Sequence, residues 1–431
     1  MRPLRWLFGL SAVSRAASGA AVLDDAGFKP QPLPPSQDPW YSAPLNFETK
    51  QPGDMLRIRL APGNLTSVID GAATAYHILY RTTDSRYRPS WAVTTLLIPS
   101  SVHFSPLGKA ALLSYQFAYN SANLDSSPSI GLYSILAQEN TALGIKSSTS
   151  FLSTLLSRGW IINTPDYMGP DAAFGASVQA GHATLDSIRA VINLGRLTGS
   201  DEFTTVMWGY SGGSIATGAA AELQTQYAPE LDISGTVLGG LVDNISADFE
   251  NLNKSPIAGT LVAFLLGVTA QYAEAKEYLE SRLRPEIKDG FLSVRDISVS
   301  DAVKMFAQKD IYSYFKGGVA DLQAPVLRKV YNAQAKLGFR GVPNMPMFVY
   351  KAIGDQFCPI EQTDVTVERW CSGGAEIIYE RKTVGEHVSE IENGKLRALE
   401  WISSIFDHSY EQPSSECDVR EVMVGVQLQK R

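Results

Sequence analysis

The segment 209–213 (GYSGG) has the residue types of a nucleophile elbow, the sharp turn between a strand and a helix that exposes a reactive serine. Phe203–Trp208 precedes it as a strand candidate, and the small-residue sequence SIATGAAAEL follows as a helix candidate. The outer glycines, Gly209 and Gly213, leave the room that strand and helix need to approach each other. We therefore predict Ser211 as the nucleophile of an acyl-transfer reaction; the alternative is an ordinary serine in a glycine-rich turn.

A serine nucleophile needs a general base, and behind such an elbow the order along the chain is serine, acid, histidine. Only His387 and His408 lie downstream of Ser211. His387 lies in a loop between a strand candidate and the terminal helix, where a base could overhang the sheet, whereas His408 follows that helix. We predict His387 as the base, with His408 as the alternative. The upstream histidines are expected in structural or surface positions: His77, His103 and His182.

The base in turn needs a carboxylate that orients its ring. Met347–Ile353 is a strand candidate, and Asp355 follows directly after its carboxyl end. Asp364 comes one turn too late and is expected on a helix face, and Glu386 is a lesser alternative because it is adjacent to the base. We predict Asp355 as the orienting carboxylate.

The reaction also requires hydrogen-bond donors for a tetrahedral oxyanion. The backbone N–H of Gly212, directly after the nucleophile, is one expected donor. The second is expected from the loop after an early strand, where residues 114–121 (SYQFAYNS) place the N–H of Asn120. The alternative is that this segment is an ordinary tyrosine-rich loop.

The remaining sequence predicts the elements that must position these residues. Short apolar segments alternate with longer amphipathic ones, a pattern typical of an α/β protein with a mostly parallel sheet. Strands are expected at Ala92–Ile98, Ala110–Phe117, Trp160–Thr164, Phe203–Trp208, Ile233–Leu241, Met347–Ile353 and Glu376–Arg381, and helices at Thr184–Leu197, at Ser214–Tyr227 and around Leu396–Ile405.

Residues 245–340 interrupt this alternation. They contain the apolar segment Ile257–Val268, followed by charged helical stretches at 275–284, 301–308 and 326–337. We predict an all-helical cap inserted into the α/β domain, whose two parts are residues 21–244 and 341–410. Six prolines within residues 21–45 indicate an extended arm on the body, and residues 411–431 are expected to form a C-terminal tail.

Composition excludes several classes of protein. The 431 residues, 45% of them hydrophobic, are typical of a folded globular chain. The 37 basic and 44 acidic residues give a net charge of −7, which argues against a nucleic-acid-binding surface. Five histidines and three cysteines are not paired at zinc-ligand spacing, and no phosphate-binding loop is present, so neither metal nor cofactor is expected.

The amino terminus resembles a secretory signal peptide. Arg2 and Arg5 precede the apolar segment Trp6–Val13, and small residues follow at 18–20, although Arg15 interrupts the pattern. The sequence therefore predicts a signal peptide at residues 1–20 and an extracellular protein; the alternative is a frayed apolar terminus. No segment is apolar enough over ~18 residues to span a membrane. Glycosylation sequons occur about as often as chance predicts, at Asn64, Asn244 and Asn253.

Taken together, these segments resemble the fungal secretory lipases, a family of α/β-hydrolases similar to Candida antarctica lipase A. The resemblance rests on SYQFAYNSA at 114–122, TPDYMGP at 164–170, GHATLDSIRA at 181–190, GYSGG at 209–213, GDQFCP at 354–359 and GEH at 385–387. It implies a Ser211–Asp355–His387 triad, an oxyanion hole at Gly212 and Asn120, and a cap at 245–340 over the acyl site. It also implies ester hydrolysis or acyl transfer without a cofactor.

Two departures from the family pattern are visible. Many members carry Asp in place of Asn120, and many have a cysteine near 126 that is bridged to the cap, where this chain has none. The three cysteines leave one thiol unpaired, and residue types alone indicate a disulfide involving Cys371 without naming its partner. The resemblance implies that Cys371 pairs with Cys417 and that Cys358 is free.

The predicted function is that of a serine carboxylic-ester hydrolase that forms an acyl-enzyme. Three interpretations differ in substrate: a lipase, an esterase or acyltransferase that modifies a fungal secondary metabolite such as a terpenoid acetate, and a non-catalytic binding protein. Ile257–Val268 could line an acyl tunnel or form a core helix of the cap. We expect a monomer that binds a small-molecule or lipid ester, with the cap as a possible contact to a lipid interface.

Overall fold

The computed structural model describes residues 31–63, 65–133 and 148–423. The expected signal peptide and the sequon at Asn64 lie outside these residues. Within them, ten strands form one sheet in the order β1-β2-β3-β5-β4-β6-β7-β8-β9-β10. The strands are β1 (Met55–Leu60), β2 (Ala72–Thr83), β3 (Pro89–Pro99), β4 (Ala110–Gln116), β5 (Ile161–Pro165), β6 (Phe203–Tyr210), β7 (Ile233–Gly239), β8 (Met347–Ala352), β9 (Ile377–Lys382) and β10 (Cys417–Val422).

The sheet is parallel from β5 to β10 and antiparallel from β1 to β5. Every residue of the central strands β6 and β8 is buried, because helices cover both faces of a parallel sheet. The α/β architecture predicted from the alternating pattern is therefore confirmed, and all seven expected strands form within two residues of the expected ends, apart from β3, which is longer at its start.

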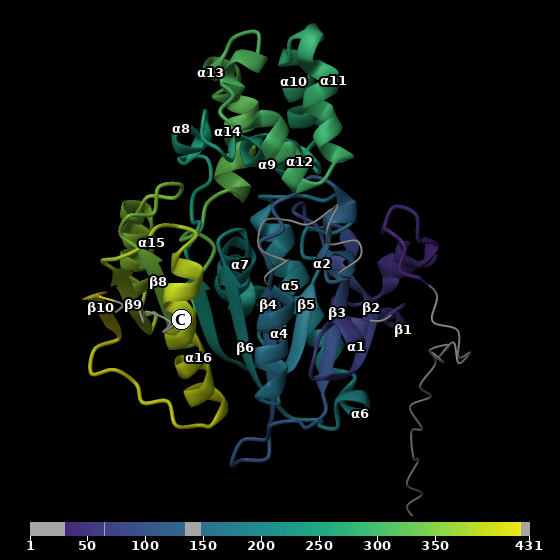
Figure 1. Cartoon of the computed structure of the whole chain (residues 1–431), viewed down its shortest axis with the longest axis vertical. Helices are drawn as coiled ribbons and strands as arrows, with labels where there is room; N and C mark the ends of the chain where they lie inside the picture. Colours follow the sequence, from purple (N-terminus) through teal and green to yellow (C-terminus); the bar gives the residue numbers. More distant parts are fainter. Residues whose placement is uncertain (1–30, 64, 134–147, 424–431) are drawn as a thin grey trace, which may run out of the picture.

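Helices cover the two faces of the sheet (Figure 1). The helices around the sheet are α1 (Leu65–Val68), α2 (Pro128–Gly131), α4 (Ser148–Ser157), α5 (Ser177–Ile192), α6 (Gly195–Thr198), α7 (Gly212–Tyr227), α15 (Ile360–Ser372) and α16 (Glu390–Phe406). Two adjacent residues of β4 point to opposite faces of the sheet. The Tyr115 ring packs on Phe151 of α4 on one face, and Gln116 Oε1 accepts a hydrogen bond from Thr217 of α7 on the other. The loop with Asn120 therefore follows a strand that is packed on both faces.

The helix expected at Thr184–Leu197 begins earlier and ends earlier than predicted. The structure has α5 from Ser177 and a separate turn, α6. The first two turns of α5 (SVQAGHA) do not show the regular spacing of large apolar residues that predicts a helix. They contain small residues instead, because they pack closely on α7. A Cβ on Gly181 would lie 2.9 Å from the backbone of Ala219.

Residues 249–334 contain helices in place of further strands. They are α8 (Phe249–Leu252), α9 (Ala258–Thr269), α10 (Ala273–Arg282), α11 (Pro285–Leu292), α12 (Val299–Phe306), α13 (Val319–Leu322) and α14 (Pro325–Gln334). Figure 1 shows them together at one end of the molecule, beyond the sheet. We call residues 249–334 the helical unit; its treatment as a cap domain remains a prediction. No helix of the described chain combines the length and the apolar character needed to cross a bilayer.

β10 lies within the segment expected to be a tail. It pairs in parallel with β9 at the edge of the sheet, and none of its side chains is fully buried, so it carries no apolar signal. A disulfide between Cys371, at the end of α15, and Cys417 holds the strand in place, and Cys358 is a buried free thiol. This is the pairing that the family resemblance implied.

Asp166, in the TPDYMGP segment after β5, is buried and accepts hydrogen bonds from the Ser129 backbone N–H at 2.9 Å and from the Ser129 Oγ at 2.6 Å. Burial raises the pKa of Asp166 to about 7, although these two bonds oppose the shift. An unfolded aspartate has a pKa near ~3.9, so between these values the folded state binds more protons than the unfolded state. The free energy of unfolding should therefore fall as pH rises, by at most about 4 kcal/mol over the whole window.

We expect Asp166→Asn to weaken this dependence on pH. The measurement is the urea midpoint of the unmodified chain and of the variant at pH 5 and pH 8. The difference between the two midpoints should be smaller in the variant, whatever its absolute stability. An equal difference in both proteins would show that Asp166 does not titrate in this window.

Candidate active site

The turn between β6 and α7 holds Ser211 in a left-handed backbone conformation, with φ 51° and ψ −126°. A non-glycine residue in this region carries strain, which is expected of the serine in a nucleophile elbow. The flanking glycines permit the close packing: a Cβ on Gly209 would lie 2.3 Å from the Gly213 carbonyl oxygen, and one on Gly213 would lie 2.0 Å from that of Gln116. The elbow geometry thus depends on both glycines.

Gly213→Ala should therefore destabilise the fold by about 3 kcal/mol or more, because a new Cβ would collide with a backbone oxygen of the neighbouring strand β4. Gly290→Ala is the matched control, since Gly290 lies within α11 with no atom near its missing Cβ. Alanine there should raise stability by up to about 1 kcal/mol. Urea unfolding of both variants measures the contrast; equal stabilities would mean that the elbow is not tightly packed.

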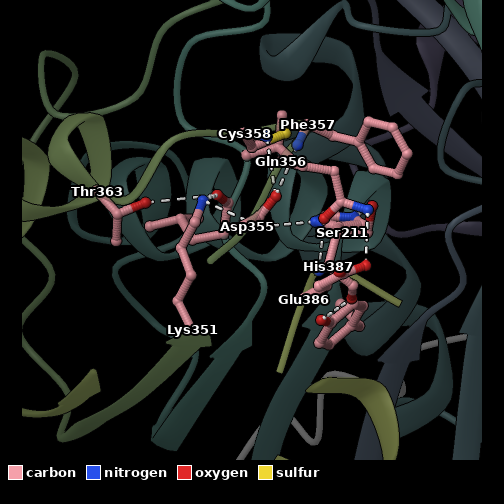
Figure 2. A network of polar contacts seen from close by, with 12 residues as sticks. Ser211, Lys351, Asp355, Gln356, Phe357, Cys358, Thr363, Glu386 and His387 are labelled. Atoms are coloured by element: carbon pink, nitrogen blue, oxygen red, sulfur yellow. Dashed lines mark hydrogen bonds and ion pairs between the residues drawn. The ribbon is translucent and has the colours of Figure 1, made fainter. Parts of the chain in front are cut away.

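Ser211, His387 and Asp355 form a continuous hydrogen-bonded chain (Figure 2). The Ser211 Oγ is 2.7 Å from His387 Nε2, and His387 Nδ1 is 2.7 Å from Asp355 Oδ2. The imidazole is fixed further by its own backbone, whose N–H donates to Gln356 Oε1 at 3.1 Å and whose carbonyl accepts the Tyr210 hydroxyl at 2.6 Å. These three predicted side chains are brought together from β6–α7, the loop after β8 and the loop after β9.

The Asp355 carboxylate is held ionised by its surroundings. Burial alone would raise its pKa, but the hydrogen bond and charge of His387, the charge of Lys351 and the N–H of Cys358 outweigh burial, so the pKa lies below its ordinary value. The Oδ1 atom accepts from the backbone N–H groups of Phe357 at 3.1 Å and Cys358 at 2.9 Å. An ionised, fixed carboxylate is the partner that a histidine base requires.

The alternative residues lie elsewhere. His408 is exposed and bonds to Thr204 at the start of β6, so it lies at the opposite end of that strand from Ser211, roughly 20 Å away at ~3.3 Å per residue. Asp364 on α15 accepts from Tyr379 and forms an ion pair with Arg381. Glu386 accepts from Gln356, at 3.4 Å. The three upstream histidines have partners away from these residues: His77 contacts Arg59, His103 contacts Asp407, and His182 contacts the Thr83 carbonyl.

The two expected oxyanion donors lie side by side. Asn120 has a positive φ of 34°, and its side chain packs directly on Gly212, where a Cβ would lie 1.8 Å from Asn120 Oδ1. Among the described residues this buried Oδ1 has no hydrogen-bond partner. The Tyr167 hydroxyl, from the TPDYMGP segment, donates to the carbonyl of Phe117 at 2.6 Å and is 3.3 Å from that of Gly212. Tyr167 thereby ties the two halves of the expected oxyanion hole together.

Two groups beside the candidate residues are not predicted from the sequence. Tyr167 lies in a family segment to which the sequence alone assigns no role. Lys351 is completely buried in β8; its Nζ donates to the Leu241 carbonyl at 2.6 Å and lies 3.6 Å from Asp355 Oδ2. The signal was present, because a lysine within the apolar strand MFVYKA must face a buried acceptor.

A cavity of about 490 Å³ opens at Ser211 and His387. One wall is aromatic and comes from the sheet and α4, namely Tyr115, Phe151, Trp208 and Tyr350. The other wall comes mostly from the helical unit and the segment that leads into it, namely Ile245, Leu252, Ile257 and Phe264. An apolar cavity with few polar groups suits a mainly hydrophobic ester. The segment Ile257–Val268 supplies both a buried helix, α9, and part of this wall.

One group of side chains in the described residues has the atom types of a metal site. Atoms of Asp355, Cys358 and His387 lie within 4.8 Å of one another. However, both ring nitrogens of His387 are already bonded, to Ser211 and Asp355, and burial raises the pKa of the Cys358 thiol well above its ordinary value. A protonated thiol and an engaged imidazole are poor metal ligands.

The two described sequons differ in their surroundings. Asn244 is partly exposed, and its Oδ1 accepts from the Ser246 hydroxyl at 2.7 Å. The Asn253 side chain bonds at both ends, donating to Asp310 at 3.1 Å and accepting from Ile311 at 2.7 Å. Glycosylation at either residue remains a prediction.

Known proteins that are similar to this chain include esterases and lipases. Residues 136–412 match the family model described as secretory lipase. A protein of Stachybotrys chartarum named "Probable trichothecene esterase" is 58% identical over 429 residues, covering 100% of this chain and 88% of that protein. The trichothecene C-3 esterase of Fusarium sporotrichioides is 40% identical, covering 91% of this chain and 88% of that protein.

The solved structures agree on the fold. The X-ray structure of Candida antarctica lipase A in its closed state superposes with a TM-score of 0.79 at 25% identity and covers 90% of both chains. The family resemblance seen in the sequence segments is therefore confirmed. The chain belongs to the secretory lipase family and is a carboxylic ester hydrolase with the α/β-hydrolase fold.

Proposed function

We propose that Ser211, His387 and Asp355 are the catalytic triad of this hydrolase. The observation that carries the assignment is the unbroken chain of two 2.7 Å hydrogen bonds that links the three side chains. His387 Nε2 removes the proton of Ser211, whose Oγ attacks the ester carbonyl. His387 then protonates the departing alcohol; Asp355 keeps the proton on Nδ1 throughout and stabilises the imidazolium that forms between the two steps.

The oxyanion of the tetrahedral intermediate is held by the backbone N–H groups of Gly212 and Asn120. This assignment is supported by their adjacency and by the position of Gly212 at the first turn of α7, where helix N–H groups have no partner within the helix. Water that enters the cavity then attacks the acyl-enzyme with His387 as base, which releases the acid. An alcohol in place of water would make the same enzyme an acyltransferase.

The substrate is an ester of a trichothecene, by analogy with the relatives that carry this name at 58% and 40% identity. A cavity of about 490 Å³ has the size expected for a site that encloses a small molecule. The second candidate is a lipase for longer acyl chains, which is favoured by the contribution of α9 to the cavity wall through Thr260 and Phe264, together with its N-cap residue Ile257.

Two experiments test these assignments. A serine-directed fluorophosphonate should label the folded chain at Ser211, which a tryptic digest would locate; absence of label would exclude the triad and favour a binding protein. Hydrolysis of a trichothecene 3-acetate should be compared with p-nitrophenyl esters of two to sixteen carbons. A rate that falls beyond short acyl chains supports the esterase, and a maximum at long chains contradicts it.

The secretory family also supports an extracellular location. We also propose that a signal peptide is cleaved after residue 20 and that the enzyme is a monomer. Amino-terminal sequencing of protein collected from the medium of an expressing fungus tests the cleavage, and sedimentation tests the monomeric state.

A further inference from the structure

A buried carboxyl group stands out in the wall of the active-site cavity. Asp248 lies on the segment between β7 and α8, is 2% exposed, and lines the cavity together with Ser211 and His387. Most of its neighbours in this wall are apolar, such as Ile245 and Leu252. Removing a carboxyl group from water is unfavourable unless hydrogen bonds replace the lost hydration.

The chain supplies few such bonds to Asp248. It occupies the N-cap position of α8, where an aspartate usually accepts from the first helical N–H groups, but its side chain makes no capping bond. The carboxyl accepts from Gln362 Nε2 at 3.1 Å, and it accepts a second hydrogen bond from the thiol of Cys358. Among the described residues, no cationic group lies within ion-pair distance, that is, within 4.0 Å, of Asp248.

The pKa of the Asp248 carboxyl also reflects its burial with few partners. Burial raises the pKa of Asp248 to about 7; the charge of Lys351 opposes the shift, and those of Asp243 and Asp355 add to it. Such a group is equipped to accept a hydrogen bond as a carboxylate and to donate one as an acid.

Asp248 is separated from the triad by a single side chain. The Cys358 N–H donates to Asp355 Oδ1 at 2.9 Å, and the Cys358 thiol lies within 4.8 Å of polar atoms of both Asp355 and His387. Asp248 is hydrogen-bonded to that thiol. An ester whose carbonyl carbon lies at Ser211 therefore needs to extend past only one residue to meet the carboxyl group.

We propose that Asp248 is a specificity-determining subsite that binds a hydroxyl group of the substrate beside the ester. The inference rests on the proposed function and narrows its substrates to esters whose alcohol part carries a further hydroxyl. A hydrocarbon chain in the same place would remove water from the carboxyl group without replacing its hydrogen bonds. The subsite thereby selects against plain fatty esters.

The test uses cyclohexyl acetate and the 2-, 3- and 4-hydroxycyclohexyl acetates, which differ only in the hydroxyl. The unmodified enzyme should hydrolyse at least one hydroxylated ester with a kcat/KM about tenfold or more above cyclohexyl acetate, the effect expected of a hydrogen bond to a charged group. Asp248→Leu should bring this ratio close to one. Asp248→Asn has the same shape and should lower it several-fold, because an amide forms the weaker bond.

Asp321→Asn is the matched control. Asp321 is also a buried acid, but it accepts from Arg282 Nε at 2.8 Å and from the Gly317 N–H at 2.6 Å and does not line the cavity, so the ratio should not change. The proposal is overturned if no hydroxylated ester is preferred, or if the preference survives in the folded Asp248 variants. If the subsite proposal fails in this way but cyclohexyl acetate is hydrolysed and the phosphonate labels Ser211, the proposed function stands without the subsite. If the ester is not hydrolysed and Ser211 is not labelled, the proposed function and the subsite are both wrong.

Discussion

Replacing Ser211 with alanine should lower kcat for ester hydrolysis by a factor of about 10⁵ or more. The Ser211 Oγ is the atom that His387 Nε2 contacts at 2.7 Å, and alanine removes the nucleophile without adding volume. When members of such a triad act as a unit, loss of the nucleophile alone abolishes nearly all of the catalysis that the triad provides. The remaining rate would come from binding and from the oxyanion donors.

Initial rates on p-nitrophenyl acetate measure the effect, and the melting temperature shows whether the fold survives. Ser157→Ala is a suitable control, because that exposed hydroxyl donates to the Thr154 carbonyl at 2.8 Å at the end of α4, and its loss should leave the rate within about twofold. A Ser211→Ala protein that retains more than about one per cent of the activity would show that another residue is the nucleophile.

Replacing Asp355 with asparagine should lower kcat about 10⁴-fold, the effect typical of this change in a serine triad. The amide presents an N–H toward His387 Nδ1 and so favours the tautomer with the proton on Nε2, which cannot accept the proton of Ser211. The change also leaves Lys351 without the carboxylate 3.6 Å from its Nζ, so the melting temperature should fall as well.

Asp364→Asn distinguishes this explanation from a general loss of charge. Asp364 also follows β8, but it bonds to Tyr379 and Arg381 on the outer part of the sheet, so its loss should change kcat by less than about twofold. A large loss in Asp364→Asn together with normal activity in Asp355→Asn would reverse the assignment.

The proximity of the three residues proposed as the triad could be predicted because each of them follows an element with a strong signal. Ser211 follows a strand in which every residue is buried, and Asp355 follows another. His387 was favoured because the sequence offers two histidines after the nucleophile. Local patterns and chain order carried this information, and neither needed the tertiary structure.

Other features could not be predicted, because their cause is contact between distant segments. β1 and β2 pair as an antiparallel extension beside β3, and β10 is added at the opposite edge, where its side chains remain partly or fully exposed. Asp248 precedes a four-residue helix, a position where the sequence alone indicates an ordinary N-cap. In the structure its side chain makes no capping bond and accepts from Gln362 instead. Asn120 lies beside Gly212, and its role as an oxyanion donor stays a proposal; its positive φ gives no signal in the sequence.

The disulfide at the edge of the sheet has a consequence for where the enzyme can be made. Cys371 and Cys417 are 46 residues apart, and the chain between them carries β9, His387 and α16. Closing a loop of this length restricts the unfolded chain by about 4 kcal/mol in the entropic account of disulfides. The folded state of the segment that carries His387 is therefore stabilised by an oxidised bond, and a chain synthesised in a reducing compartment would lack that support around the residue that we propose as the base.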